Sequence, residues 1–331
     1  MTTVTRPPVP PVTIVMYHFI RPASKRFPGF AAIEPAAFRE QLRYILRHHT
    51  PIRLTDVADA VDGSTMLPPR PVVLTFDDGY REHYDRVFPL LAEHGIFAAF
   101  FAARSALVNR RVLGANKVQF VLAAAGNTDS IIESIDLALG RSRVAGTGSA
   151  AEYRARWWVP SRFDNAAVTY AKRMLQHGLP EDVREPTLDA LFQRYVTSDE
   201  AAFAEELYFT AAEAREMRSA GMEFGGHGDR HVPLPSLDAQ TQALEIDASI
   251  DSLETIGAPR TPFLYCYVKG EHDATSLALL RARGCATAVT TREDLARPTS
   301  DNLLTLPRLD TTVLPVDGNA SPSEWTRKAI A

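Results

Sequence analysis

Apolar residues along this chain recur with two different periods. Phe38, Leu42 and Ile45 fall on one face of a helix predicted over residues 36–48, because they are spaced three or four positions apart. The stretch from Val72 to Phe76 is instead an almost continuous apolar run. Such a run is typical of a parallel strand that is buried on both faces.

Strand and helix patterns then alternate through most of the chain. Strands are predicted over 12–16, 72–76, 96–101, 222–226, 262–267, 285–289 and 303–306. Helices are predicted over 36–48, 81–94, 210–221, 238–256 and 273–283, the third of them starting at a capping box formed by Thr210 and Glu213. This alternation indicates a parallel sheet with helical crossovers, either open or closed as a barrel.

Residues 107–207 interrupt the alternation. They contain helical patterns over 116–125, 184–196 and 199–208, and we interpret them as a mainly helical insertion that caps or flanks the main domain and could act as a lid. The main domain is predicted to span 12–314. It follows a Pro-rich lead-in, 1–11, and precedes a loose C-terminal tail, 315–331.

Composition narrows the class of protein. The 331 residues are 45% hydrophobic and 23% charged, which is ordinary for a globular chain. A net charge of -4 without a basic patch argues against nucleic acid or an anionic membrane as the partner. No apolar run approaches the roughly 20 residues that cross a bilayer, and the first residues do not resemble a secretory signal. Cys266 and Cys285 fit two buried thiols in a reducing compartment, so a cytoplasmic location is expected.

Candidate chemistry begins with Asp77 and Asp78, which follow a predicted strand in the run Thr75-Phe76-Asp77-Asp78-Gly79. Adjacent carboxylates that leave a strand point in different directions, so one can bind a cation while the other accepts a proton from a metal-bound water. The alternative is an Asp-Gly turn that closes a hairpin.

Two histidines provide a second candidate feature. His227 and His231 lie four residues apart, which places them on the same side of a helical turn at a spacing used for divalent metals. With Asp78 they would form a set of two histidines and one carboxylate that leaves positions open for water and substrate. Two surface histidines at the start of a helix are the alternative.

His18, in the pair Tyr17-His18 after the first strand, could donate a proton to an amine leaving group; a core or surface histidine without a catalytic role is the alternative. His83, His94 and His272 have no partner motif and are interpreted as surface or structural residues. Trp157 and Trp158 could stack on a sugar ring, although packing within the insertion explains them better.

These motifs resemble those of the polysaccharide deacetylases, carbohydrate esterase family four. Thr75 to Gly79 matches the family's TFDDG signature, and His227 to His231 is similar to its H-[ST]-x-x-H motif. The resemblance covers roughly 12–106 and 208–314. It implies a deformed (β/α) barrel of about seven parallel strands, with Asp77 as the catalytic base and with Asp78, His227 and His231 as the metal ligands.

The general acid implied by the resemblance is His18. Some members of the family carry this acid in a C-terminal Leu-x-His motif, and no such motif follows residue 285. The branch that includes poly-N-acetylglucosamine deacetylases has an N-terminal Tyr-His pair instead, which Tyr17-His18 resembles.

Two departures from the family pattern bear on the site. Gly228 replaces the usual Ser or Thr of the histidine motif, and Tyr265-Cys266-Tyr267-Val268 stands where relatives often have Tyr-Pro-Tyr-Gly. The resemblance implies that the backbone N–H of Tyr267 binds the oxyanion. It also implies that Arg308 lies near the catalytic base, although an exposed arginine would fit the sequence equally well.

The resemblance implies a metal-dependent N-deacetylase that acts on an acylated amino sugar or sugar conjugate. One divalent metal ion is expected as the cofactor; zinc is the default for this ligand set, and nickel, cobalt or iron would also suit it. Two alternatives remain open. One is an amide hydrolase of the same scaffold that acts on a non-sugar acylated amine or a cyclic amide, and the other is a carbohydrate-binding relative that has lost catalysis.

Overall fold

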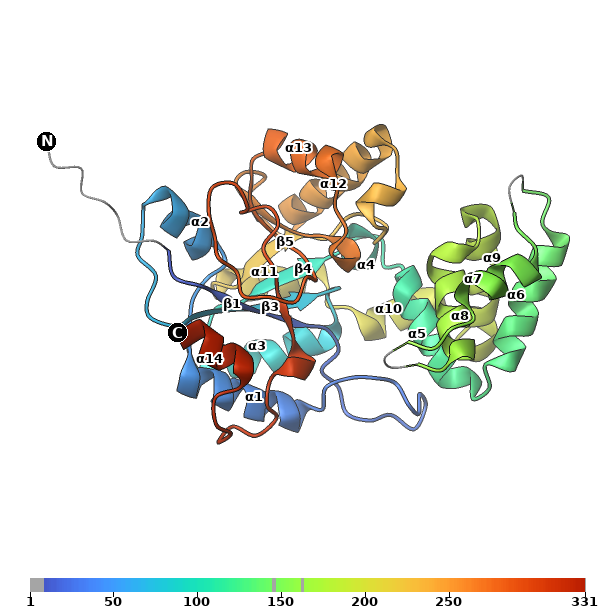
Figure 1. The fold of residues 1–331 in the computed structure, drawn as a ribbon, viewed down its shortest axis with the longest axis horizontal. Coiled ribbons are helices and arrows are strands. Elements are labelled where there is room, and N and C mark those ends of the chain that lie inside the picture. Colours follow the sequence, from blue (N-terminus) through green and yellow to red (C-terminus); the bar gives the residue numbers. More distant parts are fainter. Residues whose placement is uncertain (1–8, 145–146, 162–163, 331) are drawn as a thin grey trace, which may run out of the picture. The chain divides into compact units, whose positions relative to one another are not determined.

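The computed structural model describes residues 9–144, 147–161 and 164–330, and the chain divides into two compact units (Figure 1). Unit 1 comprises Met1–Pro22, Ala32–Arg110 and Leu207–Ala331, and unit 2 comprises Ala23–Ala31 and Arg111–Glu206. The first eight residues of the Pro-rich lead-in 1–11 lie outside the described residues.

Unit 1 is built around one parallel sheet. Its strands are β1 (Thr13–Tyr17), β2 (Thr50–Pro51), β3 (Pro71–Asp77), β4 (Ala99–Ala102), β5 (Glu223–Gly226), β6 (Phe263–Cys266), β7 (Cys285–Val289) and β8 (Leu309–Asp310). Seven of them follow the order β7-β6-β5-β4-β3-β1-β8, β2 pairs with β3, and every pair is parallel. These seven strands curl into a half-barrel, which confirms the deformed (β/α) barrel expected from the sequence.

The strands are apolar on both faces because two separate clusters pack against them. Val72, Leu74 and Phe76 of β3 join the larger apolar cluster, which also contains residues of the surrounding helices. Val73, the alternate residue, joins a second cluster formed largely by residues of other strands. Since side chains alternate along a strand, Asp77 shares the face of Val73 and points to the inner side of the curled sheet.

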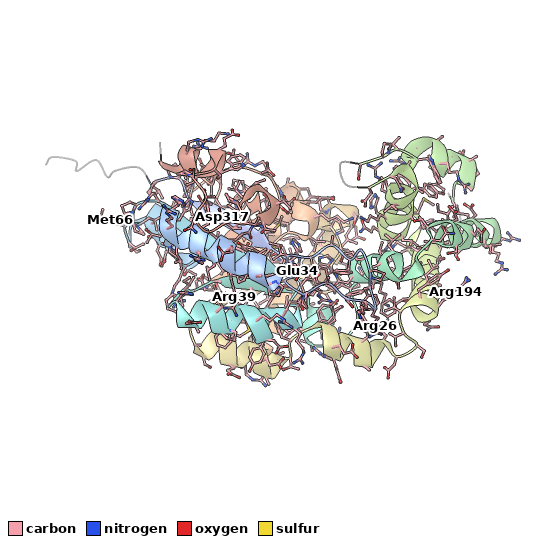
Figure 2. All side chains as sticks on the ribbon, turned by 90° about the horizontal axis from the view of Figure 1, so that it is seen from below. Arg26, Glu34, Arg39, Met66, Arg194 and Asp317 are labelled. Carbon is pink, nitrogen blue, oxygen red and sulfur yellow. The ribbon has the colours of Figure 1, made fainter. Side chains whose placement is uncertain are left out.

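Helices pack around the sheet in unit 1. They are α1 (Pro35–His48), α2 (Thr55–Asp62), the π-helical η1 (His83–Val87), α3 (Phe88–Glu93), α4 (Arg104–Leu107), α11 (Ala211–Ser219), α12 (Ala239–Thr255), α13 (Ala274–Ala282) and α14 (Glu324–Ile330), with short 3-10 turns η3 (Leu234–Ser236), η4 (Val268–Gly270) and η5 (Thr311–Val313). On α1, Phe38 packs edge-on against Tyr17 of β1, whereas Arg39 is exposed (Figure 2). The apolar face predicted for this helix is therefore the face that it buries.

Unit 2 has helices but no strand among its described residues. It contains α5 (Gly114–Ala125), α6 (Asp129–Arg141), α7 (Ala150–Trp157), α8 (Ala166–Arg173), the π-helical η2 (Met174–Gly178), α9 (Glu181–Tyr195) and most of α10 (Glu200–Leu207). The ammonium of buried Lys117 lies 2.6 Å from Asp189 Oδ1 and 2.9 Å from Glu200 Oε2, so the charge buried in this unit is paired. Trp157 packs over Gly178 and stacks on Tyr153, as expected for a packing role, whereas Trp158 is exposed and its ring meets that of Tyr170 at a tilt.

Two predictions about the C-terminal third were wrong. Residues 303–306 form a turn that touches β7 through a single bridge, Val289 to Leu306, and the last strand is β8. Residues 315–331 are not a loose tail, because they include α14, whose Thr326 is buried and lies 2.8 Å from the hydroxyl of Tyr44. Both segments are held by contacts that are distant in sequence.

Two smaller findings concern the cysteines and the membrane. Cys266 is buried as expected, but Cys285 is only half-buried. Among the described residues, no helix combines the length and the apolar composition that a membrane span requires.

Candidate active site

Asp77 and Asp78 lie at the turn where β3 ends. Asp78 and Gly79 have φ values of 71° and 78°, both in the left-handed region. A Cβ at residue 79 would lie 2.9 Å from the Cβ of Ala102, so only glycine fits there. The turn directs the two carboxylates to different partners. It does not close a hairpin, since β3 pairs in parallel with both of its main neighbours.

His227 and His231 lie in the loop that follows β5. The loop is not helical: Gly228 and His231 have φ values of 75° and 58°, so the expected helical turn is absent. The two imidazole centroids are nevertheless 4.8 Å apart. The four-residue spacing brings the rings together through a tight loop, not through helical periodicity.

Glu245 of α12 holds this loop in place. Its carboxylate is buried and accepts hydrogen bonds from the backbone N–H groups of Asp229 (2.8 Å) and Arg230 (3.0 Å) and from Arg230 Nε (2.7 Å). The N–H of Arg104 donates to the carbonyl of Gly228 at 3.1 Å. Glu245 therefore supports the loop in which Gly228 has replaced a hydroxyl side chain, and sequence reasoning did not find it.

Asp78, His227 and His231 converge on one point. Asp78 Oδ1 lies 3.4 Å from His227 Nε2 and 3.1 Å from His231 Nε2, and the three potential ligand atoms lie within 4.8 Å of one another. Burial alone would raise the pKa of Asp78, but the two histidines outweigh it and hold that pKa well below its usual range. The carboxylate is therefore anionic at neutral pH, as a metal ligand must be.

The surroundings of these atoms fit a divalent cation. Asp78 Oδ1 is buried and lacks a well-oriented hydrogen-bond donor among the described residues, whereas Oδ2 accepts one from the hydroxyl of Tyr80 at 2.5 Å. His227 Nδ1 lies 2.7 Å from the carbonyl of Cys266, which favours the tautomer with its lone pair on Nε2. Two imidazoles and one carboxylate suit zinc and other first-row transition metals.

Asp77 is paired with Arg308 inside the curled sheet. Arg308 Nη1 and Nη2 donate to the two carboxylate oxygens at 2.8 and 2.7 Å, and Arg308 Nε donates to the carbonyl of Thr290 at 2.8 Å. Arg308 is only 1% exposed, so the exposed alternative was wrong. Burial would raise the pKa of Asp77, yet the guanidinium lowers it to about 2. Asp77 is consequently a carboxylate at every physiological pH.

Cys266 contributes its thiol to the same network. Its Sγ lies 3.5 Å from Asp77 Oδ2 and accepts a hydrogen bond from Arg308 Nη2 at 3.2 Å. Asp77, His227 and Cys266 also have atoms close enough to surround a cation. We do not assign a metal to this set, because the guanidinium of Arg308 already provides its positive charge.

His18 lies beside Asp77, just after β1. Its Nε2 is 3.8 Å from Asp77 Oδ2, and its side chain is 42% exposed. His83, for which the sequence predicts a surface or structural role, is fully buried, and its Nε2 lies 2.8 Å from the backbone carbonyl of His18. Of the other two histidines without a motif, His94 is exposed and His272 Nδ1 lies 3.2 Å from the carbonyl of Gly270.

Tyr267 does not offer the free backbone N–H that we expected. This N–H donates to the carbonyl of Val289 at 3.1 Å, and the side chain is fully buried against Tyr265 and His272. The sequence around Cys266 lacks the Pro and Gly of related loops, and here the backbone continues the pairing of β6 with β7. An oxyanion donor is therefore not assigned to Tyr267.

A family model described as "Polysaccharide deacetylase" matches residues 65–127 and 187–288. The matched ranges include the turn after β3 and the histidine loop after β5, and they leave 128–186 of the helical unit unmatched. The poly-beta-1,6-N-acetyl-D-glucosamine N-deacetylase of Escherichia coli K12 is 40% identical over 63 residues, which are 19% of this chain and 9% of that protein. The chain thus matches only a small part of that relative.

Solved structures share the fold at low sequence identity. The Streptococcus pyogenes deacetylase PplD in complex with acetate gives a TM-score of 0.58 at 18% identity, covering 98% of this chain and 100% of that one. IcaB from Ammonifex degensii gives 0.55 at 16% identity, covering 98% and 99%. The BpsB deacetylase domain from Bordetella bronchiseptica gives 0.51 at 17% identity, covering 91% and 95%.

Proposed function

The chain belongs to the polysaccharide deacetylase family, and on that premise we propose that it is a metal-dependent N-deacetylase of amino sugars or sugar conjugates. It would hydrolyse an acetamide, or another short N-acyl group, to an amine and a carboxylate. The names of its relatives, one of which acts on an N-acetylglucosamine polymer and one of which binds acetate, support this choice of substrate.

One observation carries the proposal. Asp78, His227 and His231 place three metal-ligating atoms together, while Asp77, the neighbour of one ligand, remains outside the set and is held as an anion by Arg308. A ligand set beside an independent carboxylate is what hydrolysis by an activated water requires.

The chemistry follows from the charges of these residues. A divalent cation held by Asp78, His227 and His231 would supply polarisation of the acyl oxygen and a lowered pKa for water. Asp77 would accept the proton of the attacking water. Arg308 binds both of its oxygens and so fixes the orientation of the carboxylate. A carboxylate oxygen of Asp77 lies within 4.8 Å of a ring nitrogen of His227, so this proton would travel a short distance.

Departure of the amine requires a proton, and His18 is the residue that we propose supplies it. Its Nε2 is near Asp77, and its ring is partly exposed, so it can reach both the base and a bound substrate. Amine leaving groups are poor without protonation, so an amide substrate needs such an acid.

Asp77→Asn tests the central assignment. We expect turnover to fall by at least about a thousandfold, as for loss of an essential catalytic group, with metal content near that of wild type. Asp78→Asn is the matched comparison, because it should lose the metal as well as the activity. Loss of metal in Asp77→Asn with retention in Asp78→Asn would show that the two aspartates have been assigned in the wrong order.

The substrate class is tested separately from the chemistry. Acetate release would be measured from N-acetylglucosamine, its oligomers and nucleotide-linked forms, and from acylated non-sugar amines and ureides. Preference for the last group would favour the alternative amide hydrolase. No acetate release from any of them by the metal-loaded protein would favour a binding protein without catalysis. The expected cytoplasmic location remains a prediction, which cell fractionation would test.

A further inference from the structure

Residues 18–21, the segment that carries His18, pack against residues 80–83, which follow the Asp77–Gly79 turn. β1 ends at Tyr17, so residues 18–21 lie beyond the last pair of its ladder with β3. Three side-chain contacts join these residues to 80–83, and each contact involves a different pair of residues. The residues after β1 therefore take their position from the turn that bears the two aspartates.

The first two contacts are an aromatic stack and an ion pair. Phe19 stacks on Tyr80 with ring centroids 3.7 Å apart, and the hydroxyl of Tyr80 donates a hydrogen bond to Asp78. Arg21 binds both carboxylate oxygens of Glu82, at 2.8 Å each, and Glu82 is buried. A bidentate pair of this kind fixes orientation as well as distance.

The third contact is the hydrogen bond of His83 to His18 itself. The acceptor is a backbone carbonyl, so His83 Nε2 must carry the hydrogen. Nδ1 is buried and has no hydrogen-bond partner among the described residues, and the ring packs against Phe76 and Phe100. Burial lowers the pKa of His83, which keeps this ring in the neutral form that donates from one nitrogen only.

We propose that His83 is a positioning residue for His18: its Nε2–H fixes the peptide that follows His18 and thereby aims the imidazole at the leaving nitrogen. The proposal rests on the role of general acid assigned above to His18. It is needed because the His18 ring is 42% exposed, so packing alone restrains the ring weakly. A bond to the backbone limits the directions that the side chain can take.

The test compares two substitutions and two substrates. His83→Phe keeps an aromatic ring and removes the donor, whereas His83→Gln keeps a donor. For acetate release from N-acetylglucosamine oligomers, we expect His83→Phe to lower kcat on the order of 10- to 100-fold, with KM changed by less than about twofold. His83→Gln should recover most of the loss. Hydrolysis of 4-nitrophenyl acetate should stay near wild type in both, because its phenolate departs without a proton.

A double-mutant cycle shows whether His83 acts through His18. In a His18→Ala background, His83→Phe should cause little further loss, because the residue that it positions has gone. The proposal would be overturned if His83→Phe lowered kcat as much in the His18→Ala background as in the wild type. It would also be overturned if His83→Phe lowered ester hydrolysis as much as amide hydrolysis. Wild-type amide activity in His83→Phe would overturn it as well. Wild-type activity in His18→Ala would instead show that the general acid in the proposed function is wrong.

A control and a spectroscopic measurement separate positioning from stability. His49→Gln also removes a buried histidine, which bonds Thr326 near the C-terminus, and it should leave kcat unchanged. Imidazole ¹⁵N shifts should show the Nε2–H tautomer for His83, and His83→Phe should shift the ring signals of His18 where His49→Gln does not. The opposite tautomer, or unmoved His18 signals, would contradict the proposal even if no sugar substrate is turned over.

Discussion

The carboxylate of Asp77 is buried, and the positive charge of Arg308 compensates its negative charge. Both side chains are nearly inaccessible, and five donor contacts hold the guanidinium against Asp77, Thr75, Thr290 and Cys266. Removing one partner of a buried ion pair leaves the other charge without compensation, which costs more than the pair itself contributes. The ionisation of Asp77 therefore depends on a residue far away in the sequence.

Replacing Arg308 should change the pH profile. Asp77 in the wild type stays ionised down to a pKa of about 2, so its protonation does not limit activity above that pH. In Arg308→Gln burial is opposed only by the weaker effects of His18 and His227, so this pKa should rise and the acid limb of kcat/KM should move to higher pH. The free energy of unfolding should fall by about 3 kcal/mol.

The matched control for that substitution is Arg260→Gln. Arg260 pairs with Asp251 and Glu254 at the surface, where such a pair contributes about 0–1 kcal/mol. It should leave both the pH profile and the stability nearly unchanged. An acid limb in Arg308→Gln that coincides with that of the wild type would show that Arg308 does not set the ionisation of Asp77.

Glu245 would act on the candidate metal ligands through the backbone. Its carboxylate binds two successive N–H groups between His227 and His231, so we expect Glu245→Gln to lower metal affinity by about 10- to 100-fold. Titration with zinc or cobalt, with calorimetry or the cobalt spectrum as the readout, would measure it. Glu254→Gln on the same helix is the control, and equal affinities in the two variants would contradict the role.

At the scale of elements, polar groups attach α14 to α1 and to the residue that follows it. The hydroxyl of Thr326 lies 2.8 Å from that of Tyr44 and 3.3 Å from His49 Nε2, and the N–H of Ser323 donates to Tyr44 at 2.7 Å. Buried polar groups of this kind are satisfied only when both elements are in place. The C-terminal helix is therefore part of the folded unit.

This attachment predicts a pH dependence of stability. Burial, helped by His48 and Arg70, lowers the pKa of His49 from 6.5 to about 4. Between these values the unfolded chain binds a proton that the folded chain does not, so stability is complete above about pH 6.5 and declines toward pH 4. The decline should be on the order of 3 kcal/mol at most.

His49→Gln should flatten that part of the curve. Urea unfolding at a series of pH values between 4 and 7, interpreted with a constant m-value, would measure the slope for each protein. The free energy of unfolding of His49→Gln can be lower at every pH, because the substitution alters the hydrogen bond between residue 49 and the hydroxyl of Thr326. The slope is the informative quantity, and identical slopes for the two proteins would refute the assignment.

At the scale of the whole molecule, the candidate metal ligands join the ends of two strands. Asp78 follows β3 and His227 follows β5, with β4 between them in the sheet. The unfolded chain does not hold these ligands together, so a bound metal stabilises only the folded state.

Removal of the metal should consequently lower Tm. A free concentration of metal one hundred times its Kd adds about 2.7 kcal/mol to the free energy of unfolding. Treatment with EDTA should remove this stabilisation, and added zinc should restore it. For Asp78→Asn, the Tm with EDTA should equal the Tm with added zinc. If zinc raised the Tm of Asp78→Asn as much as that of the wild type, the metal would bind elsewhere.

Much of unit 1 could be predicted from the sequence because its signals are local. Apolar runs mark strands buried on both faces, helical spacing marks the face that α1 buries, and the Thr210–Glu213 capping box marks the start of α11. The Asp77-Asp78-Gly79 turn needs a left-handed backbone, which glycine permits at its last position. Each of these features depends on residues that are neighbours along the chain.

Contacts between distant segments were decided only by the tertiary structure. Arg308 beside Asp77, Glu245 under the histidine loop and His83 behind His18 have no periodic signal, since one polar residue in a helix or loop could meet many partners. The same applies to the N–H of Tyr267, which pairs with β7. A sequence pattern shows which residues must be buried, whereas the packing of the curled sheet determines what each of them meets.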